Sequence, residues 1–231
     1  MVWFPGTSQV PGIILCQSPS WGVEMPPIAL GVLKTALKAQ NIQLNTRDLN
    51  LETWLHLKTT ARTDFWDKSN LHLWTNSRLY AEQLFPLLDP LLEKFSDELA
   101  YGPEQILCFT VLSSSVLFTN QLVERIRLKV PEKVIVAGGP CLSFFEERAR
   151  LRSDFDYYVV GEGEETLAEL YRYLAEGLKT LPKGVYSTRE LGRDLPYRKM
   201  EDPARYGTPD YSDLRLADYQ LRALPVIFTR S

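Results

Sequence analysis

Small polar and glycine-rich segments follow five short apolar runs in this sequence, and their residue types suit contact with a ligand. Ser18 follows the first run, Asp48 and Asn50 follow the second, and Ser113 and Ser114 follow the third. The segments after the fourth and fifth runs are Gly138-Gly139-Pro140 and Gly161-Glu162-Gly163-Glu164. Hydroxyls donate and accept hydrogen bonds without bulk, and glycine lets a backbone approach a ligand closely. These twelve residues are predicted to bind a ligand, and no catalytic residue is assigned.

The acidic segment after the fifth run narrows the class of ligand. Its spacing is not the G-x-G-x-x-G of a dinucleotide site, and Glu162 and Glu164 would repel a pyrophosphate. Carboxylates suit a neutral ligand that is rich in amide N–H donors. Two plainer explanations stay open. Gly138 and Gly139 can form a tight turn, and the two acids can complement the dipole of a following helix.

Composition and cysteine spacing exclude several other functions. The net charge is −3, with acids and bases mixed along 231 residues, whereas a nucleic-acid binder normally carries a basic stripe. Cys16, Cys108 and Cys141 lie far apart, so they offer no usual spacing for a zinc site or an iron–sulfur cluster. The sequence has no run of about 18 apolar residues, which a membrane span needs. We therefore expect a soluble, cytoplasmic protein with no metal-ligating residues of its own.

Apolar runs that alternate with helical patterns predict an α/β fold. The five expected strands are residues 12–16, 42–48, 106–112, 134–137 and 157–160. Helices are expected at residues 28–40, 116–129, 144–151 and 164–174. This alternation predicts a flavodoxin-like (Rossmann-like) five-stranded parallel sheet with helices on both faces. Ligands bind such sheets outside the carboxyl ends of the strands, where the twelve predicted residues would gather.

Two stretches interrupt the alternation. Residues 51–100 are too long for one crossover and hold both histidines and three tryptophans, so a helical insertion with a break near Pro86 or Pro90 is expected. This insertion is either a lid or interdomain surface, or additional core packing. Residues 179–231 are rich in proline, with one short strand-like piece at 184–187, and are expected to form a linker toward another domain. The α/β domain itself would cover residues 10–178.

Several motifs carry a family resemblance when they are taken in order. Residues 26–33, PPIALGVL, are similar to a Pro-Pro-x-Gly/Ala-x-x-x-Leu helix opening, and Asp48-x-Asn50 takes the place of an Asp-x-His loop. Residues 136–140, VAGGP, and 159–166, VVGEGEET, match the two most recognisable motifs. Together they resemble the cobalamin-binding domains that precede radical S-adenosylmethionine domains.

The C-terminal part of the chain resembles the same family. Asp202-Pro203 and residues 209–213, PDYSD, look like its linker. Residues 224–231, LPVIFTRS, resemble the strand that runs into its C-x-x-x-C-x-x-C cluster motif. The resemblance implies that the partner of this chain is a radical S-adenosylmethionine domain outside these residues. That domain would hold the [4Fe-4S] cluster and S-adenosylmethionine, so this chain alone is not expected to be catalytic.

The resemblance also implies the cofactor and the state in which it binds. Cobalamin would lie over the carboxyl edge of the sheet, with its tail in a groove lined by the serines and glycines named above. Asn50 stands where the family has a histidine, and asparagine is a poor cobalt ligand compared with imidazole. Cobalamin is therefore expected to bind base-off, without a protein nitrogen on cobalt. In the full-length enzyme the implied chemistry is methyl transfer or related radical chemistry.

Two alternatives from another functional class stay open. The chain can be a binding module that holds cobalamin or a nucleotide without catalysis, or a flavodoxin-like scaffold that has lost cobalamin binding. A phosphorelay receiver domain is disfavoured, because Gln17-Ser18 and Ser113-Ser114 stand where its acids would be.

Overall fold

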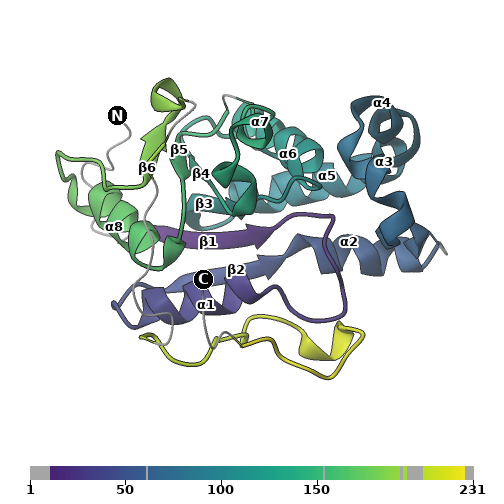
Figure 1. Cartoon of the computed structure of the whole chain (residues 1–231), viewed down its shortest axis with the longest axis horizontal. Coiled ribbons are helices and arrows are strands. Elements are labelled where there is room, and N and C mark those ends of the chain that lie inside the picture. Colours follow the sequence, from purple (N-terminus) through teal and green to yellow (C-terminus); the bar gives the residue numbers. More distant parts are fainter. Residues whose placement is uncertain (1–10, 61, 153, 193–194, 197–204, 227–231) are drawn as a thin grey trace.

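One sheet of six strands organises the chain, with helices on both faces (Figure 1). The structure, a computed structural model, describes residues 11–60, 62–152, 154–192, 195–196 and 205–226. The strands are β1 (Gly12–Gln17), β2 (Leu44–Asp48), β3 (Glu104–Thr110), β4 (Val134–Gly138), β5 (Tyr157–Val159) and β6 (Val185–Ser187). Their order is β2-β1-β3-β4-β5-β6, and the first five are parallel. The order of these five is that of flavodoxin-like folds, so the predicted fold class is confirmed.

The sixth strand extends the predicted five-stranded sheet. β6 pairs antiparallel with β5, and Tyr186 lies opposite Tyr158. It comes from the strand-like piece inside the proline-rich extension. An antiparallel edge strand on a parallel sheet is common in α/β folds.

Eight helices are found among the described residues, and they cover the two faces of the sheet. They are α1 (Ile28–Lys38), α2 (Leu49–Lys58), α3 (Leu71–Thr75), α4 (Ser77–Leu79), α5 (Phe85–Tyr101), α6 (Val116–Lys129), α7 (Phe145–Arg148) and α8 (Gly163–Glu176). Alternate strand residues point to opposite faces. One set, which includes Leu107, Phe109 and Ile135, joins a core with α5 and α6. The other set joins a core with α1 and α8. Burial on both faces explains the continuous apolar runs of the central strands.

The helical insertion belongs to the core on one face of the sheet. Trp74, Leu84 and Phe95 are fully buried there. A break was expected near Pro86 or Pro90. Pro86 lies in the first turn of α5, where this helix begins, whereas α5 continues through Pro90 without a break. Interior proline costs a helix about 3 kcal/mol. Pro90 is exposed while the helix buries a long apolar face, so burial outweighs that cost.

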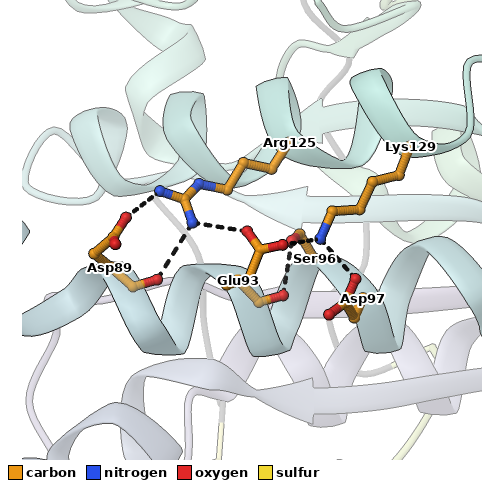
Figure 2. Close-up of polar contacts among 6 residues, drawn as sticks. All are labelled: Asp89, Glu93, Ser96, Asp97, Arg125 and Lys129. Atoms are coloured by element: carbon orange, nitrogen blue, oxygen red, sulfur yellow. Dashed lines mark hydrogen bonds and ion pairs between the residues drawn. The ribbon is translucent and has the colours of Figure 1, made fainter.

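A ladder of charges joins α5 to α6 on the outside of this core. Figure 2 shows Arg125 bonded to Asp89 and Glu93, and Lys129 bonded to Glu93 and Asp97. The Arg125–Glu93 distance is 3.0 Å, and both Lys129 distances are 2.6 Å. Because Glu93 is shared by both cations, the four contacts form one network.

The C-terminal strap, residues 205–226, packs against α1 and reaches the outer strand β2 (Figure 1, yellow). Tyr211 is buried against Gly31, and Asp210 donates its backbone N–H to the Gly31 carbonyl at 3.1 Å. Lys34 of α1 bonds Ser212 at 2.8 Å and pairs with Asp213. The described part of the expected linker therefore lies on the α/β domain. That it leads to a further domain stays a prediction.

No helix among the described residues has the length and apolar character that crossing a membrane requires.

Candidate functional site

The strand register brings the predicted binding segments to one edge of the sheet. Gln17, the last residue of β1, lies opposite Asp48 on one side and Thr110 on the other. Thr110 in turn lies opposite Gly138 of β4. The carboxyl ends of four strands are thus level with one another. β1 and β3 are neighbours in the sheet. The chain continues from β1 to β2 on one side and from β3 to β4 and β5 on the other, so the switch point, where the strand order reverses, lies between β1 and β3.

Three serines surround this switch point. Ser18 and Ser20, in the loop after β1, are almost completely buried, and so is Ser114 in the loop after β3. Ser114 Oγ donates to the Ser20 carbonyl at 2.7 Å, which joins the two loops across the switch point. Ser18 Oγ is buried and lacks a hydrogen-bond partner within the described part of the chain. A buried hydroxyl without a partner is costly, and it is the feature here that a bound polar group would satisfy.

Asn50 is fully buried, and its carboxamide holds the loop after β1. Its Oδ1 accepts the Trp21 backbone N–H at 3.1 Å and the Trp66 indole N–H at 2.8 Å. Its Nδ2 donates to the Trp21 carbonyl at 3.2 Å. Both ends of the carboxamide are therefore committed to contacts within the chain.

Asp48 connects the same edge to the C-terminal strap. Its Oδ1 accepts the Leu51 N–H and caps α2, while its Oδ2 accepts the Tyr219 hydroxyl at 2.6 Å. Burial raises the pKa of the Asp48 carboxyl to about 6, although the Tyr219 and Leu51 hydrogen bonds oppose this shift. Burial also raises the pKa of Tyr219. Asp48 thus serves the fold by two bonds, and any contact with a ligand would be additional.

The glycine pair after β4 has a packing role of its own. Gly139 has φ +99°, and a Cβ there would lie 2.7 Å from the Val111 backbone N. A side chain at Gly138 would instead meet only ordinary contacts at 3.9 Å or more. Pro140 is exposed and begins a short turn at this edge. The tight-turn explanation therefore accounts for Gly139, whereas nothing in the packing demands glycine at position 138.

The segment after β5 lies against α1. Gly161 has φ +96°, and a Cβ on Gly163 would lie 3.0 Å from Leu33 of α1. Glu162 precedes α8 and Glu164 is buried in its first turn, and both already have interaction partners within the chain. The helix-dipole explanation for the two acids thus fits their positions.

Ser113 is exposed at the tip of the loop after β3, and a cation unforeseen from the sequence lies beside it. Arg150 donates to the Ser113 carbonyl at 3.4 Å and to the Thr75 carbonyl of the insertion at 3.2 Å. It therefore links the carboxyl edge to the helical insertion.

Three aromatic residues at the edge are also missing from the sequence prediction. Trp66 donates a hydrogen bond to Asn50, and Tyr219 donates one to Asp48. Trp21 leaves 52% of its surface exposed. The only signal for Trp21 in the sequence is its position in the loop after the first strand. The other two come from the insertion and the strap, whose paths the sequence pattern does not determine.

The cysteines offer no nucleophile in this structure. All three are buried, and burial raises the pKa of Cys16 and of Cys141 to about 12. Among the described residues there is also no group of three or more histidine, cysteine or acidic side chains placed to hold a metal ion.

A groove lies away from this edge. It is an open groove of about 630 Å³ between α1 and the strap, and Lys38, Tyr206 and Leu224 are among its lining residues. None of the twelve predicted binding residues lines it. Asp210 in this groove has a pKa lowered to about 2 by hydrogen bonds from Ser212 and by Lys38 and Lys34.

The sequence matches none of the protein-family models and none of the curated proteins. Two similar solved structures are both of the radical S-adenosylmethionine methyltransferase TsrM from Kitasatospora setae. One has tryptophan substrate and a SAM analog (aza-SAM) bound, with 18% identity and a TM-score of 0.46 over 77% of this chain. The other has cobalamin and a [4Fe-4S] cluster bound, with 21% identity and a TM-score of 0.47 over 79%. This chain spans only 29% and 30% of those chains, and a likeness this distant does not establish a shared function.

Proposed function

We propose that this chain binds cobalamin at the carboxyl edge of its sheet and forms the N-terminal, cofactor-holding portion of a radical S-adenosylmethionine enzyme. The observation that carries the proposal is the strand order, because β2-β1-β3-β4-β5 gathers the family-like motifs around one switch point. The motif resemblance supplies the identity of the cofactor. The proposal places the [4Fe-4S] cluster and S-adenosylmethionine outside these residues, since the three cysteines are far apart and buried.

The residues at this edge fit cobalamin by their chemistry. The ligand has a polar, amide-rich periphery. The switch point offers small side chains and a buried Ser18 hydroxyl that has no hydrogen-bond partner among the residues that the structure describes. Ser18 and Ser114 would bond its tail, and Gly138 would leave room beside β4. When bound, cobalamin would supply a cobalt centre that carries and donates a methyl group. The protein residues position the ligand and contribute no cobalt ligand from the loop after β2.

One observation favours the second candidate, a scaffold that no longer binds cobalamin. The Ser114–Ser20 hydrogen bond closes the switch point, and a tail between β1 and β3 must displace it. A hydrogen bond of this kind contributes roughly 0.5–1.5 kcal/mol, which a ligand that bonds both serines would recover. The two candidates therefore differ in whether purified protein takes up the cofactor.

Titration of the purified protein with hydroxocobalamin, followed by equilibrium dialysis and visible absorbance, tests the proposal. We expect saturable binding with a Kd in the micromolar range, and Ser18→Ala should weaken it about fivefold through loss of one hydrogen bond. Ser96→Ala removes an equally buried serine hydroxyl in α5, away from the edge, and should leave the Kd unchanged. Absence of micromolar binding would favour the scaffold.

The same titration tests the absence of a protein ligand on cobalt. His56 and His72 are both exposed, in α2 and α3. We expect the absorbance spectra of bound hydroxocobalamin to be identical in wild type, His56→Ala and His72→Ala. The electron paramagnetic resonance spectra, recorded after chemical reduction of the bound cofactor to the Co(II) state, should be identical as well. A nitrogen-ligation signal that disappears in either variant would refute this part of the proposal.

A further inference from the structure

We infer that Trp21 is the residue that contacts the face of the ligand, and that Asn50 is the positioning residue that presents it. This inference rests on the proposed function and deepens it. It changes the role of Asn50 from a contact residue, as the motif predicts, to one that acts through its neighbour.

Trp21 is the aromatic side chain of the loop after β1, and it keeps 52% of its surface exposed. Ser18, Ser20 and Val23 in this loop are between 0% and 5% exposed, whereas Gly22, Glu24 and Met25 are exposed as Trp21 is. Tryptophan has the largest apolar area to remove from water, so it is the exposed residue of this loop that offers a contact surface. Its place is the loop after β1, which borders the switch point.

The backbone that carries this indole is fixed from three directions. Asn50 bonds both the N–H and the carbonyl of Trp21, Ser114 bonds the carbonyl of Ser20, and the Gln220 N–H bonds the carbonyl of Val23 at 3.2 Å. Three separate segments of the chain thus hold Ser20, Trp21 and Val23. An aromatic side chain on a fixed backbone loses little conformational freedom on binding, which is the property of residues that dominate binding energy.

Asn50 is itself oriented by a further contact, so its role is positional. Its Oδ1 accepts the Trp66 indole N–H at 2.8 Å, and the Trp66 ring packs edge-on against the buried Trp74 at a centroid distance of 5.2 Å. The contacts therefore run in series from the buried Trp74 through Trp66 and Asn50 to the backbone of Trp21. The ligand chemistry that suits an exposed indole is a flat, extended ring system such as the corrin macrocycle, because stacking on an aromatic face requires a planar partner.

Hydroxocobalamin titrations of Trp21 variants test the contact. We expect Trp21→Ala to raise the Kd about 10- to 100-fold and Trp21→Phe to raise it less, because a smaller aromatic ring still stacks. The control is Tyr101→Ala, which removes an exposed aromatic residue that precedes β3 at the opposite edge of the sheet and should leave the Kd within twofold of wild type. Wild-type affinity in Trp21→Ala would overturn the contact and leave cobalamin binding standing. Failure of the wild-type protein to bind would overturn both.

The positioning role of Asn50 has a readout that needs no ligand. Asn50→Ala and Trp66→Phe should both speed hydrogen exchange of the Trp21 amide in the ligand-free protein, with the larger effect in Asn50→Ala. The visible spectrum of bound cobalamin should be the same in these variants as in wild type, while the Kd rises. A Trp21 amide that exchanges at the wild-type rate in folded Asn50→Ala, or a changed cobalt spectrum, would overturn this role.

Discussion

Asp48 combines burial, a helix cap and a hydrogen bond from Tyr219, and these contacts make its protonation part of the folding equilibrium. Its pKa in the folded protein is about 6, against an ordinary value of 3.8. The folded state therefore binds the proton more tightly than the unfolded state does. The resulting stabilisation is complete below about pH 4 and is lost as the pH rises through 6.

Asp48→Asn should remove this pH dependence. Wild-type protein is expected to lose up to roughly 3 kcal/mol of unfolding free energy from this residue between pH 4 and 7. Urea denaturation at several pH values measures the slope. Asp210→Asn is the matched control, because the pKa of Asp210 is lowered to about 2 and its contribution changes only below pH 4. Parallel curves for wild type and Asp48→Asn would contradict the prediction.

At the scale of single residues, the sequence predicts where a residue lies in the fold better than what its side chain contacts. Asp48 ends β2 and Asn50 follows two residues later, close to where they were expected, because the end of an alternating strand is visible in the residue pattern. Their partners are Tyr219 and Trp66, which stand 171 and 16 residues away in the sequence. A side chain that bonds across the fold takes its role from packing, which no local pattern contains.

The paired helices α5 and α6 depend on apolar packing and are joined on the outside by the charge ladder of Figure 2. Arg125→Ala breaks the contacts with Asp89 and Glu93 and should destabilise the protein by about 1 kcal/mol or less, because partly exposed ion pairs are screened by solvent. The loss should shrink further at 1 M salt. Chemical denaturation measures it. Arg78→Ala serves as control, since its pair with Glu82 is 3.8 Å long and largely exposed.

The contact between α1 and the strap can be tested by a substitution for which helix propensity predicts a gain in stability and packing predicts a loss. Alanine in place of a helical glycine ordinarily stabilises by about 1 kcal/mol. A Cβ on Gly31, however, would lie 2.5 Å from Cε1 of Tyr211. We expect Gly31→Ala to destabilise by about 1–3 kcal/mol and to expose the strap to proteolysis.

Gly192→Ala is the matched control for this test. A Cβ at that exposed position would meet its nearest neighbour only at 3.9 Å. Thermal unfolding and limited proteolysis compare the two variants. A Gly31→Ala protein that melts higher than wild type would refute the docking contact.

Element boundaries show where local signals suffice. α6 covers Val116–Lys129 as predicted, and Asn41 and Gly177 adopt the left-handed conformation just after α1 and α8. These signals are local, since a left-handed residue ends a helix through its own backbone. Pro90 gave a wrong signal for a helix end. The free-energy cost of an interior proline is visible in the local sequence, whereas the burial of α5 that offsets this cost depends on the whole core.

At the scale of the molecule, the strap and the proposed ligand edge share the loop after β1. Gln220 and Leu221 donate their N–H groups to the carbonyls of Val23 and Glu24 at 3.2 and 2.9 Å. A ligand that orders this loop must therefore stabilise the docked strap, and the coupling is reciprocal.

Saturation with hydroxocobalamin should accordingly slow hydrogen exchange of the Gln220 and Leu221 amides several-fold. Amides of β6, at the far edge of the sheet, should exchange at the ligand-free rate and serve as an internal control. Equal protection everywhere would indicate global stabilisation only, and no protection at Gln220 would exclude the coupling.

The strands of the sheet were more predictable from the sequence than the segments that pack around the sheet. The strands with continuous apolar runs are legible because each is enclosed on both faces, whereas β2 at the edge is legible from its alternation of buried and more exposed residues. The packed position of the strap depends on particular contacts such as Tyr211 on Gly31, and proline-rich composition alone indicates only an extension.

The bond between Asp213 and β2 has a consequence for self-association. β2 is the outer strand of the sheet, and its Thr46 N–H donates to Asp213 Oδ2 at 2.9 Å, while Lys34 pairs with the same carboxylate. Outer strands with unpaired N–H groups act as templates on which strands of other chains add. The strap covers this part of the edge with a charged side chain, so its release would expose an N–H group of β2 to which a strand of another chain could add.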